Sequence, residues 1–242
     1  MRTPITYYGG KQGCTQTRMY SNGLKRKEID MSKKIMFNDK YGLTQAVLDG
    51  RKTMTRRVIT YPSRFRDENI AGLYRYGIVL GDQLNVVLYD ADERLDSCYI
   101  SSRYKVGEVV AIAQSYSDCG NMPDYGLDED GYPIIPKRSG FFNKMFVRAD
   151  LMPHHIRITN IKIKRLQDIS DGDCLKEGIY KLNSANGNGG IAYSFVGASS
   201  SKHIGLYASP REAFAALIDK VSGKGTWESN PYVFAYEFEL ID

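Results

Sequence analysis

The sequence predicts a mixed α+β protein, in which a sheet forms the core and short helices flank it. Residues 74–80 and 84–89 have strand patterns on either side of a glycine-containing turn, and residues 232–240 alternate between apolar and polar side chains. Residues 210–221 instead repeat apolar side chains at helical spacing, and Pro210 suits a first helical turn. At 242 residues and without an internal repeat, the chain can bury one sizeable core.

The first predicted strand is short and comprises residues 35–37. A helix should follow it, because the side chain of Asn38 or Asp39 can cap a helix and the next apolar residues recur at helical spacing. These apolar residues are Leu43, Ala46 and Val47. Gly50 stands where a helix ends in a residue that tolerates positive φ, and residues 53–59 favour a strand.

Three more strands and one long loop are predicted in the middle of the chain. Residues 109–112 form a continuous apolar run that suits a buried strand, and residues 144–148 also have a strand pattern. Residues 155–164 alternate, apart from a slip at Thr159-Asn160 that predicts a β-bulge. Residues 117–140 are rich in glycine, proline and acidic side chains, which predicts a long loop or lid.

A second helix should begin after Ser170, whose hydroxyl can cap it and whose following residues are acidic. Glu177 lies near the end of this helix and Gly178 stops it. Residues 183–201 are rich in glycine, asparagine and serine, which predicts an ordered insertion or a mobile loop. Residues 223–230 are predicted to be a turn region that contains Trp227.

The eight residues from Gly50 to Arg57 combine four cations with two hydroxyls at a predicted helix–strand junction. Their spacing, G-x-K-x-x-T-x-R, is formed by Gly50, Lys52, Thr55 and Arg57. This spacing resembles the core motif of the ASCH superfamily. Such a concentration of cations and hydroxyls suits a site for an anionic or polar ligand.

Three later segments resemble the same family, and the last of them resembles its phage and prophage members in particular. They are YKVGEVV at residues 104–110, IKIKRLQDISDGDCLKE ending at Glu177, and WESNP at residues 227–231 with the strand after it. The resemblance implies a PUA-like fold, which is a partly closed mixed β-barrel flanked by short helices. It also implies a ligand cleft that the core motif lines.

The resemblance implies a catalytic set as well. In ASCH-like amidohydrolases that act on acetylcytidine, the matching positions are Lys52, Thr55 and Glu177. A threonine hydroxyl needs a base beside it, and a lysine can serve only if burial and neighbouring cations lower its pKa. A carboxylate can orient that amine or transfer a proton. Hydrolysis of an acylated nucleoside such as acetylcytidine is therefore one predicted function.

One departure from the family favours binding over catalysis. Many relatives have a glutamate after the strand at 109–112, whereas this chain has Ala113-Gln114, and a glutamine cannot act as a general base. A binding site would hold phosphate with cations and a base with polar and aromatic side chains. The residues predicted to contact the ligand are Arg51, Lys52, Arg56 and Arg57 for phosphate, and Thr55, Gln114, Tyr116 and Trp227 for the base.

Three classes of function remain open from the sequence. The favoured one is a PUA-like protein that binds RNA or a nucleotide, and the second is the amidohydrolase. The third is a phage interaction protein that binds a host factor and uses the fold as a scaffold. Structural roles are also open, since Trp227 can simply pack and Arg57 can pair with Glu177 or Glu237.

Residues 1–30 differ from the rest of the chain and are predicted to be a basic tail or a remnant. They hold six basic and two acidic residues, a net charge of +4 out of +5, so residues 31–242 contribute only +1. Residues 4–11 resemble the opening of adenine-specific DNA methyltransferases, but the D-P-P-Y tetrad of that family does not occur. We expect the domain to start at Met31 and to carry insertions near 117–142 and 179–209.

The cysteines and histidines give no metal-binding pattern. The four cysteines have no C-x-x-C spacing, and the histidines do not pair with them at ligand spacing, so no metal and no cofactor are predicted. No apolar run approaches the roughly 18 residues of a membrane span, and the N-terminus does not resemble a signal peptide. The expected location is cytoplasmic. The sequence does not predict the oligomeric state.

Overall fold

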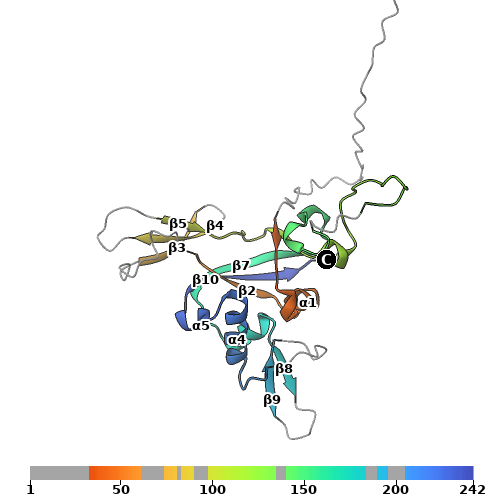
Figure 1. Cartoon of the computed structure of the whole chain (residues 1–242). Helices are drawn as coiled ribbons and strands as arrows, with labels where there is room; N and C mark the ends of the chain where they lie inside the picture. Colours follow the sequence, from red (N-terminus) through yellow and green to blue (C-terminus); the bar gives the residue numbers. More distant parts are fainter. Residues whose placement is uncertain are drawn as a thin grey trace, which may run out of the picture.

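The computed structural model describes residues 33–60, 74–80, 83–89, 98–134, 140–183, 190–195 and 205–241. The predicted tail, residues 1–30, and the predicted domain start at Met31 lie outside the described residues. The described part is α+β, as predicted. It contains a five-stranded sheet, a three-stranded sheet and a two-stranded hairpin, together with short helices (Figure 1).

The five-stranded sheet is the centre of the fold, and its strand order is β1-β6-β7-β10-β2. Only β1 and β6 are parallel, and the other neighbours are antiparallel. Figure 1 shows β7, β10 and β2 side by side, with α4 and α5 to one side of them. The strands are β1 (Lys34–Ile35), β2 (Met54–Val58), β6 (Val109–Ile112), β7 (His155–Arg165) and β10 (Tyr232–Leu240).

The bulge predicted from the slip in alternation is confirmed in β7. Along the β7–β10 ladder, Asn160 pairs with Glu237 and Ile158 pairs with Phe238, so Thr159 is the extra residue. The extra residue resets the alternation, which lets both Ile158 and Ile161 point into the core. Without this shift, one half of the strand would turn its isoleucines toward solvent.

The remaining strands form hairpins. The predicted pairing of residues 74–80 with the following strand is confirmed, since β3 (Tyr74–Leu80) pairs antiparallel with β4 (Gln83–Tyr89). The next strand, β5 (Cys98–Ser101), pairs with β4. Within the predicted insertion 179–209, β8 (Tyr180–Asn183) pairs with β9 (Ile191–Ser194), so part of that segment is a hairpin and not a loop.

The predicted helices are present, but the predicted cap of the first one was wrong: Asn38 caps the 3-10 turn before it, and α1 itself begins after Gly42 with no side-chain cap. The other two predicted helix starts are confirmed. The Ser170 side chain accepts a hydrogen bond from the Asp173 N–H at the start of α3 (Asp171–Lys176), and α4 (Pro210–Ser222) has proline in its first turn. The others are α1 (Leu43–Leu48), α2 (Tyr116–Cys119) and α5 (Thr226–Ser229), with 3-10 turns at η1 (Asp39–Tyr41), η3 (Lys144–Phe146) and η4 (Ala149–Leu151). No helix in the described part of the chain is long and apolar enough to cross a membrane.

The main core lies between the five-stranded sheet and the helices α1, α3 and α4. The apolar stripe of α4 buries Phe214 and Leu217, while Val221, which also fits the helical spacing, is 38% exposed near the end of the helix. The fully buried larger side chains of this core are Ile35, Val47, Val110, Ile112, Ile156, Ile158, Leu166, Phe214 and Tyr236.

Two local predictions were wrong. Residues 144–148 do not form a strand, because the Asn143 side chain accepts the Met145 N–H and turns the chain into η3. Residues 223–230 are not only a turn, since they contain α5, which starts after Gly225 in the left-handed region. At residues 144–148 the Asn143 side chain thus outweighed the apolar pattern.

The five-stranded sheet has two open edges, β1 and β2. No backbone ladder joins these edges among the described residues. The gap between them is instead spanned by a side chain, since Arg57 of β2 donates from Nη2 to the Met36 carbonyl oxygen just after β1, at 2.6 Å. The edges therefore face one another across a space that side chains line.

Candidate functional site

The core motif adopts the helix, glycine stop and strand that its sequence predicts. Gly50 has φ +70°, and the backbone N–H groups of Arg51 and Lys52 both donate to the Ala46 carbonyl oxygen at the end of α1. The Thr53 N–H then donates to the Lys176 carbonyl oxygen of α3 at 2.9 Å. This turn directs the Lys52 side chain inward and fixes the start of β2 against α3.

The Lys52 ammonium is buried and donates three hydrogen bonds. Its Nζ lies 2.8 Å from the Met54 carbonyl oxygen, 2.7 Å from the Glu177 carbonyl oxygen and 2.8 Å from Glu177 Oε2. Burial lowers the pKa of Lys52 and the Glu177 carboxylate opposes that shift. In this structure the Lys52 amine therefore donates its hydrogen bonds to the protein itself.

Arg56 completes the same buried cluster from the other side. Its Nη1 lies 3.0 Å from Glu177 Oε1, and its Nη2 lies 3.1 Å from Asp173 Oδ2. Its Nε is buried and has no hydrogen-bond partner among the described residues. We call Lys52, Arg56, Asp173 and Glu177 the ion cluster; it pairs two cations with two carboxylates.

The three predicted catalytic residues come together at a small hollow of about 80 Å³. Lys52, Thr55 and Glu177 line it, and Phe214 and Leu217 of α4 close it on the apolar side. The sequence separation between Lys52 and Glu177 is 125 residues, so the tertiary fold alone creates this proximity.

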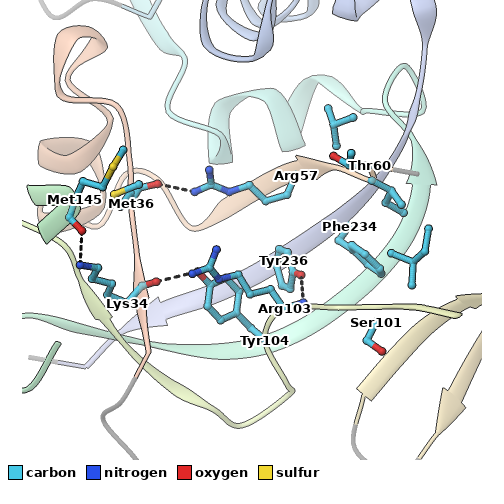
Figure 2. A pocket seen from close by; sticks show the side chains of 13 residues that line it. Lys34, Met36, Arg57, Thr60, Ser101, Arg103, Tyr104, Met145, Phe234 and Tyr236 are labelled. Carbon is cyan, nitrogen blue, oxygen red and sulfur yellow. Dashed lines mark hydrogen bonds between the residues drawn. The ribbon is translucent and has the colours of Figure 1, made fainter. Parts of the chain in front are cut away.

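A larger hollow of about 470 Å³ lies between the open edges β1 and β2 (Figure 2). We call it the edge pocket. The core motif contributes Arg57 to it, and Arg57 also lines the small hollow. Its described lining consists of Lys34, Met36, Arg57, Val58, Ile59, Thr60, Ile100, Ser101, Arg103, Tyr104, Met145, Phe234 and Tyr236.

The floor of the edge pocket consists of buried aromatic rings, since Tyr104, Phe234 and Tyr236 are 3%, 6% and 1% exposed. Tyr104 and Tyr236 meet edge to face with ring centroids 5.4 Å apart, and Phe234 lies 6.2 Å from Tyr236. The Tyr236 hydroxyl accepts the Arg103 backbone N–H at 3.0 Å, and the Tyr104 hydroxyl donates to the Lys34 carbonyl oxygen at 3.1 Å. Burial raises the pKa of Tyr236 to about 12, so this phenol stays neutral.

Three cations line the edge pocket above this floor. Arg57 is held by Met36 and lies 5.8 Å from the Phe37 ring, and a guanidinium has further N–H donors for a ligand. Lys34 donates from Nζ to the carbonyl oxygens of Met145 and Val147, at 2.7 and 2.5 Å. Burial and the nearby Arg103 lower the pKa of Lys34. Figure 2 shows Arg57 reaching across the gap to Met36.

The other predicted ligand-binding residues are placed elsewhere. Arg51 pairs with Asp49 at 2.8 Å and lies over the Tyr180 ring at 4.2 Å. Tyr116 is buried in a smaller core beside η4, where its hydroxyl accepts the Arg148 N–H. The described linings of the small hollow and the edge pocket include neither of them.

Gln114 and Trp227 are also outside both linings. The Gln114 N–H donates to Met152 Sδ, and its side-chain oxygen is buried with no partner among the described residues. Trp227 packs edge to face on Phe214 at 6.1 Å, and its backbone N–H donates to Asp219. Arg56, and not Arg57, pairs with Glu177, while Glu237 pairs with Lys162.

The sequence reasoning missed most of the edge pocket. Lys34, Arg103, Phe234 and Tyr236 were not singled out, although Tyr104 belongs to a segment that carries the family resemblance. One feature of the sequence could have indicated it: Phe234 and Tyr236 are two residues apart in the last predicted strand, so their side chains lie on the same face. No group of histidine, cysteine and acidic side chains that could hold a metal ion occurs in the described ranges.

No family model, no curated protein and no solved structure matches the chain.

The ion cluster predicts a strong effect of Glu177 on stability. Glu177→Gln leaves the Lys52 and Arg56 cations buried beside a neutral amide, and loss of one partner from a buried pair costs about 3–5 kcal/mol. Chemical denaturation should show a loss of this size in the free energy of unfolding. The control is Glu239→Gln, which removes an exposed pair with Arg157 and should cost less than about 1 kcal/mol. Equal losses in the two variants would contradict a structural role of the cluster.

The raised pKa of Tyr236 predicts a loss of stability at alkaline pH. In the unfolded chain the phenol ionises at about 10, whereas in the folded protein it ionises at about 12. The folded state therefore binds more protons between these values, so stability falls as pH rises. From pH 9 to pH 11 the free energy of unfolding should decrease by about 1 kcal/mol more in the wild type than in Tyr236→Phe. Parallel pH profiles of the two proteins would show that Tyr236 is not buried in this way.

Proposed function

We propose that the protein binds RNA or a nucleotide in the edge pocket. The observation that carries the proposal is the combination of an aromatic floor with three cations, Lys34, Arg57 and Arg103, around one hollow. Nucleotide sites combine these two chemistries, since aromatic side chains contact bases and cations neutralise phosphate. No carboxylate stands among the described residues that line the pocket, so its charge favours an anion.

The sizes of the two hollows support the same choice. A pocket for a small ligand typically measures about 300–1,000 Å³. The edge pocket, at about 470 Å³, falls within this range, whereas the small hollow, at about 80 Å³, falls well below it. The hydroxyls of Thr60 and Ser101 lie in the lining and can donate to or accept from a base edge.

The core motif and the sheet edges beside it also support a proposal for the fold. We propose that the chain is an ASCH-domain protein with a PUA-like, partly closed barrel. Gly50, Lys52, Thr55 and Arg57 supply the motif at the helix–strand junction where the resemblance implies it. The edges β1 and β2 face one another and are bridged by Arg57, which supports a barrel that is nearly closed at this position.

Titration with single nucleotides tests the binding proposal. CMP, UMP, AMP and GMP are added to the protein in a calorimeter at low salt, and at least one should bind with an affinity that falls as salt rises. Arg57→Ala should weaken that binding at least tenfold, because a charge-assisted hydrogen bond to phosphate is lost. Arg157→Ala is the matched control, since Arg157 is an exposed arginine on β7 that pairs with Glu239.

Two results would count against nucleotide binding. One is an equal effect of the Arg57 and Arg157 substitutions, and the other is no heat of binding with any of the four nucleotides. The second result would favour the scaffold function, in which the surface recognises a host protein.

The amidohydrolase is the second candidate, and the convergence of Lys52, Thr55 and Glu177 favours it. In such a reaction water adds to the acyl carbonyl of acetylcytidine, the C–N bond breaks, and acetate and cytidine leave. Two observations weigh against it: the Lys52 ammonium donates three hydrogen bonds, and the hollow is smaller than a nucleoside site. Catalysis therefore requires the hollow to open and Lys52 to lose a proton.

Incubation with acetylcytidine decides between the candidates. If the second is correct, the wild type and the neighbouring variant Thr53→Ala release cytidine, and Thr55→Ala is at least 100-fold slower. Cytidine is quantified by liquid chromatography. A wild-type rate no higher than that of Thr55→Ala would eliminate the hydrolase.

A further inference from the structure

We infer that the ligand of the edge pocket is a single-stranded nucleic acid that continues beyond the pocket on both sides, and not a free nucleotide. This inference rests on the proposed function. Its basis is a chain of three hollows, in which neighbouring hollows share lining residues and cations are concentrated along the whole length.

Two further hollows share lining residues with the edge pocket and so lie next to it. One, of about 670 Å³, shares Lys34 and Arg103 with the edge pocket; we call it the trough. The other, of about 440 Å³, shares Met36, Arg57 and Met145 with it; we call it the outer hollow. A nucleotide in the edge pocket therefore has room for a further residue at either end.

Charge is concentrated on these three hollows. The edge pocket contributes three cations, the trough adds Lys33 and Arg148, and the outer hollow adds Lys40 and Lys144. Against these seven cations the described linings contain two carboxylates, so the three hollows carry a net charge of +5. Residues 31–242 together carry only +1, and the rest of this region is therefore net −4. A uniformly solvated surface would not show this separation of charge.

The exposed ion pair in the trough can exchange for phosphate. Arg148 is paired with Asp150 at 2.5 Å, but the Arg148 side chain is 61% exposed. Exposed pairs of this kind contribute little, so a phosphate that neutralises the cation loses little in replacing the carboxylate.

The apolar surface beside the outer hollow suits unpaired bases. Phe142 is 71% exposed and Phe146 is 59% exposed, and they flank the Asn143–Met145 segment that lines the hollow. Exposed aromatic side chains beside cations are the usual platform for stacked bases of a single strand. A base that fills the edge pocket cannot pair with a second strand, which excludes a duplex at this position.

The test measures affinity against ligand length. Oligouridylates of one, three and six nucleotides, and the same lengths of oligodeoxyuridylate, are titrated with the full chain by competition with a labelled hexamer. The hexamer should bind at least tenfold more tightly than the mononucleotide, and a six-base-pair duplex should bind more weakly than the single strand. Comparison of the two series shows whether RNA or DNA binds more tightly.

Substitutions in the trough separate this inference from the proposed function. Arg148→Ala should weaken hexamer binding about three- to tenfold, reduce the salt slope by about 0.7 and leave mononucleotide binding unchanged. Arg57→Ala should weaken both, and Arg157→Ala should weaken neither. Equal affinity for one and six nucleotides, or no effect of Arg148→Ala on the hexamer, would overturn the inference while leaving nucleotide binding in place. Failure of every nucleotide and oligonucleotide to bind would overturn both.

Discussion

The Glu177 carboxylate lies between the Lys52 ammonium and the Arg56 guanidinium, and each of its oxygens accepts a hydrogen bond from one of them. This buried contact joins the start of β2 to the end of α3, two segments that meet only in the folded chain. Buried charges are tolerated only when they are paired and hydrogen-bonded, so the cluster fixes the relative position of these two elements. The small hollow and the orientation of β2 both depend on it.

The alternation of β2 divides the core motif between two environments. Arg56 turns toward α3 and stabilises the ion cluster, whereas Arg57 turns to the open edge of the sheet and lines the edge pocket. One strand thus supports a structural site on one face and a solvent-accessible cationic site on the other. This division explains why the neighbouring cations Arg56 and Arg57 have different partners.

Much of the local structure follows from short-range patterns. Ser170, Gly50, Pro210 and the slip at Thr159-Asn160 each act through a cap, a positive φ, a helix start or a bulge. These effects depend on residues a few positions apart, which is why the spacing alone predicts them. The segment 144–148 shows the limit, because the Asn143 cap determined its backbone and the apolar pattern did not.

Taken alone, the sequence determined the α+β class, most strands and helices, and the helix, glycine stop and strand around Gly50. It also indicated Lys52, Thr55 and Glu177 as a set through the family resemblance. Only the tertiary structure decided that Lys34, Arg57, Arg103 and Tyr236 line one hollow, that Tyr116 is buried in the smaller core, and that the half-buried Trp227 packs on Phe214. The physical reason is that these positions depend on strand order and register, which are set by pairing between segments far apart in the chain.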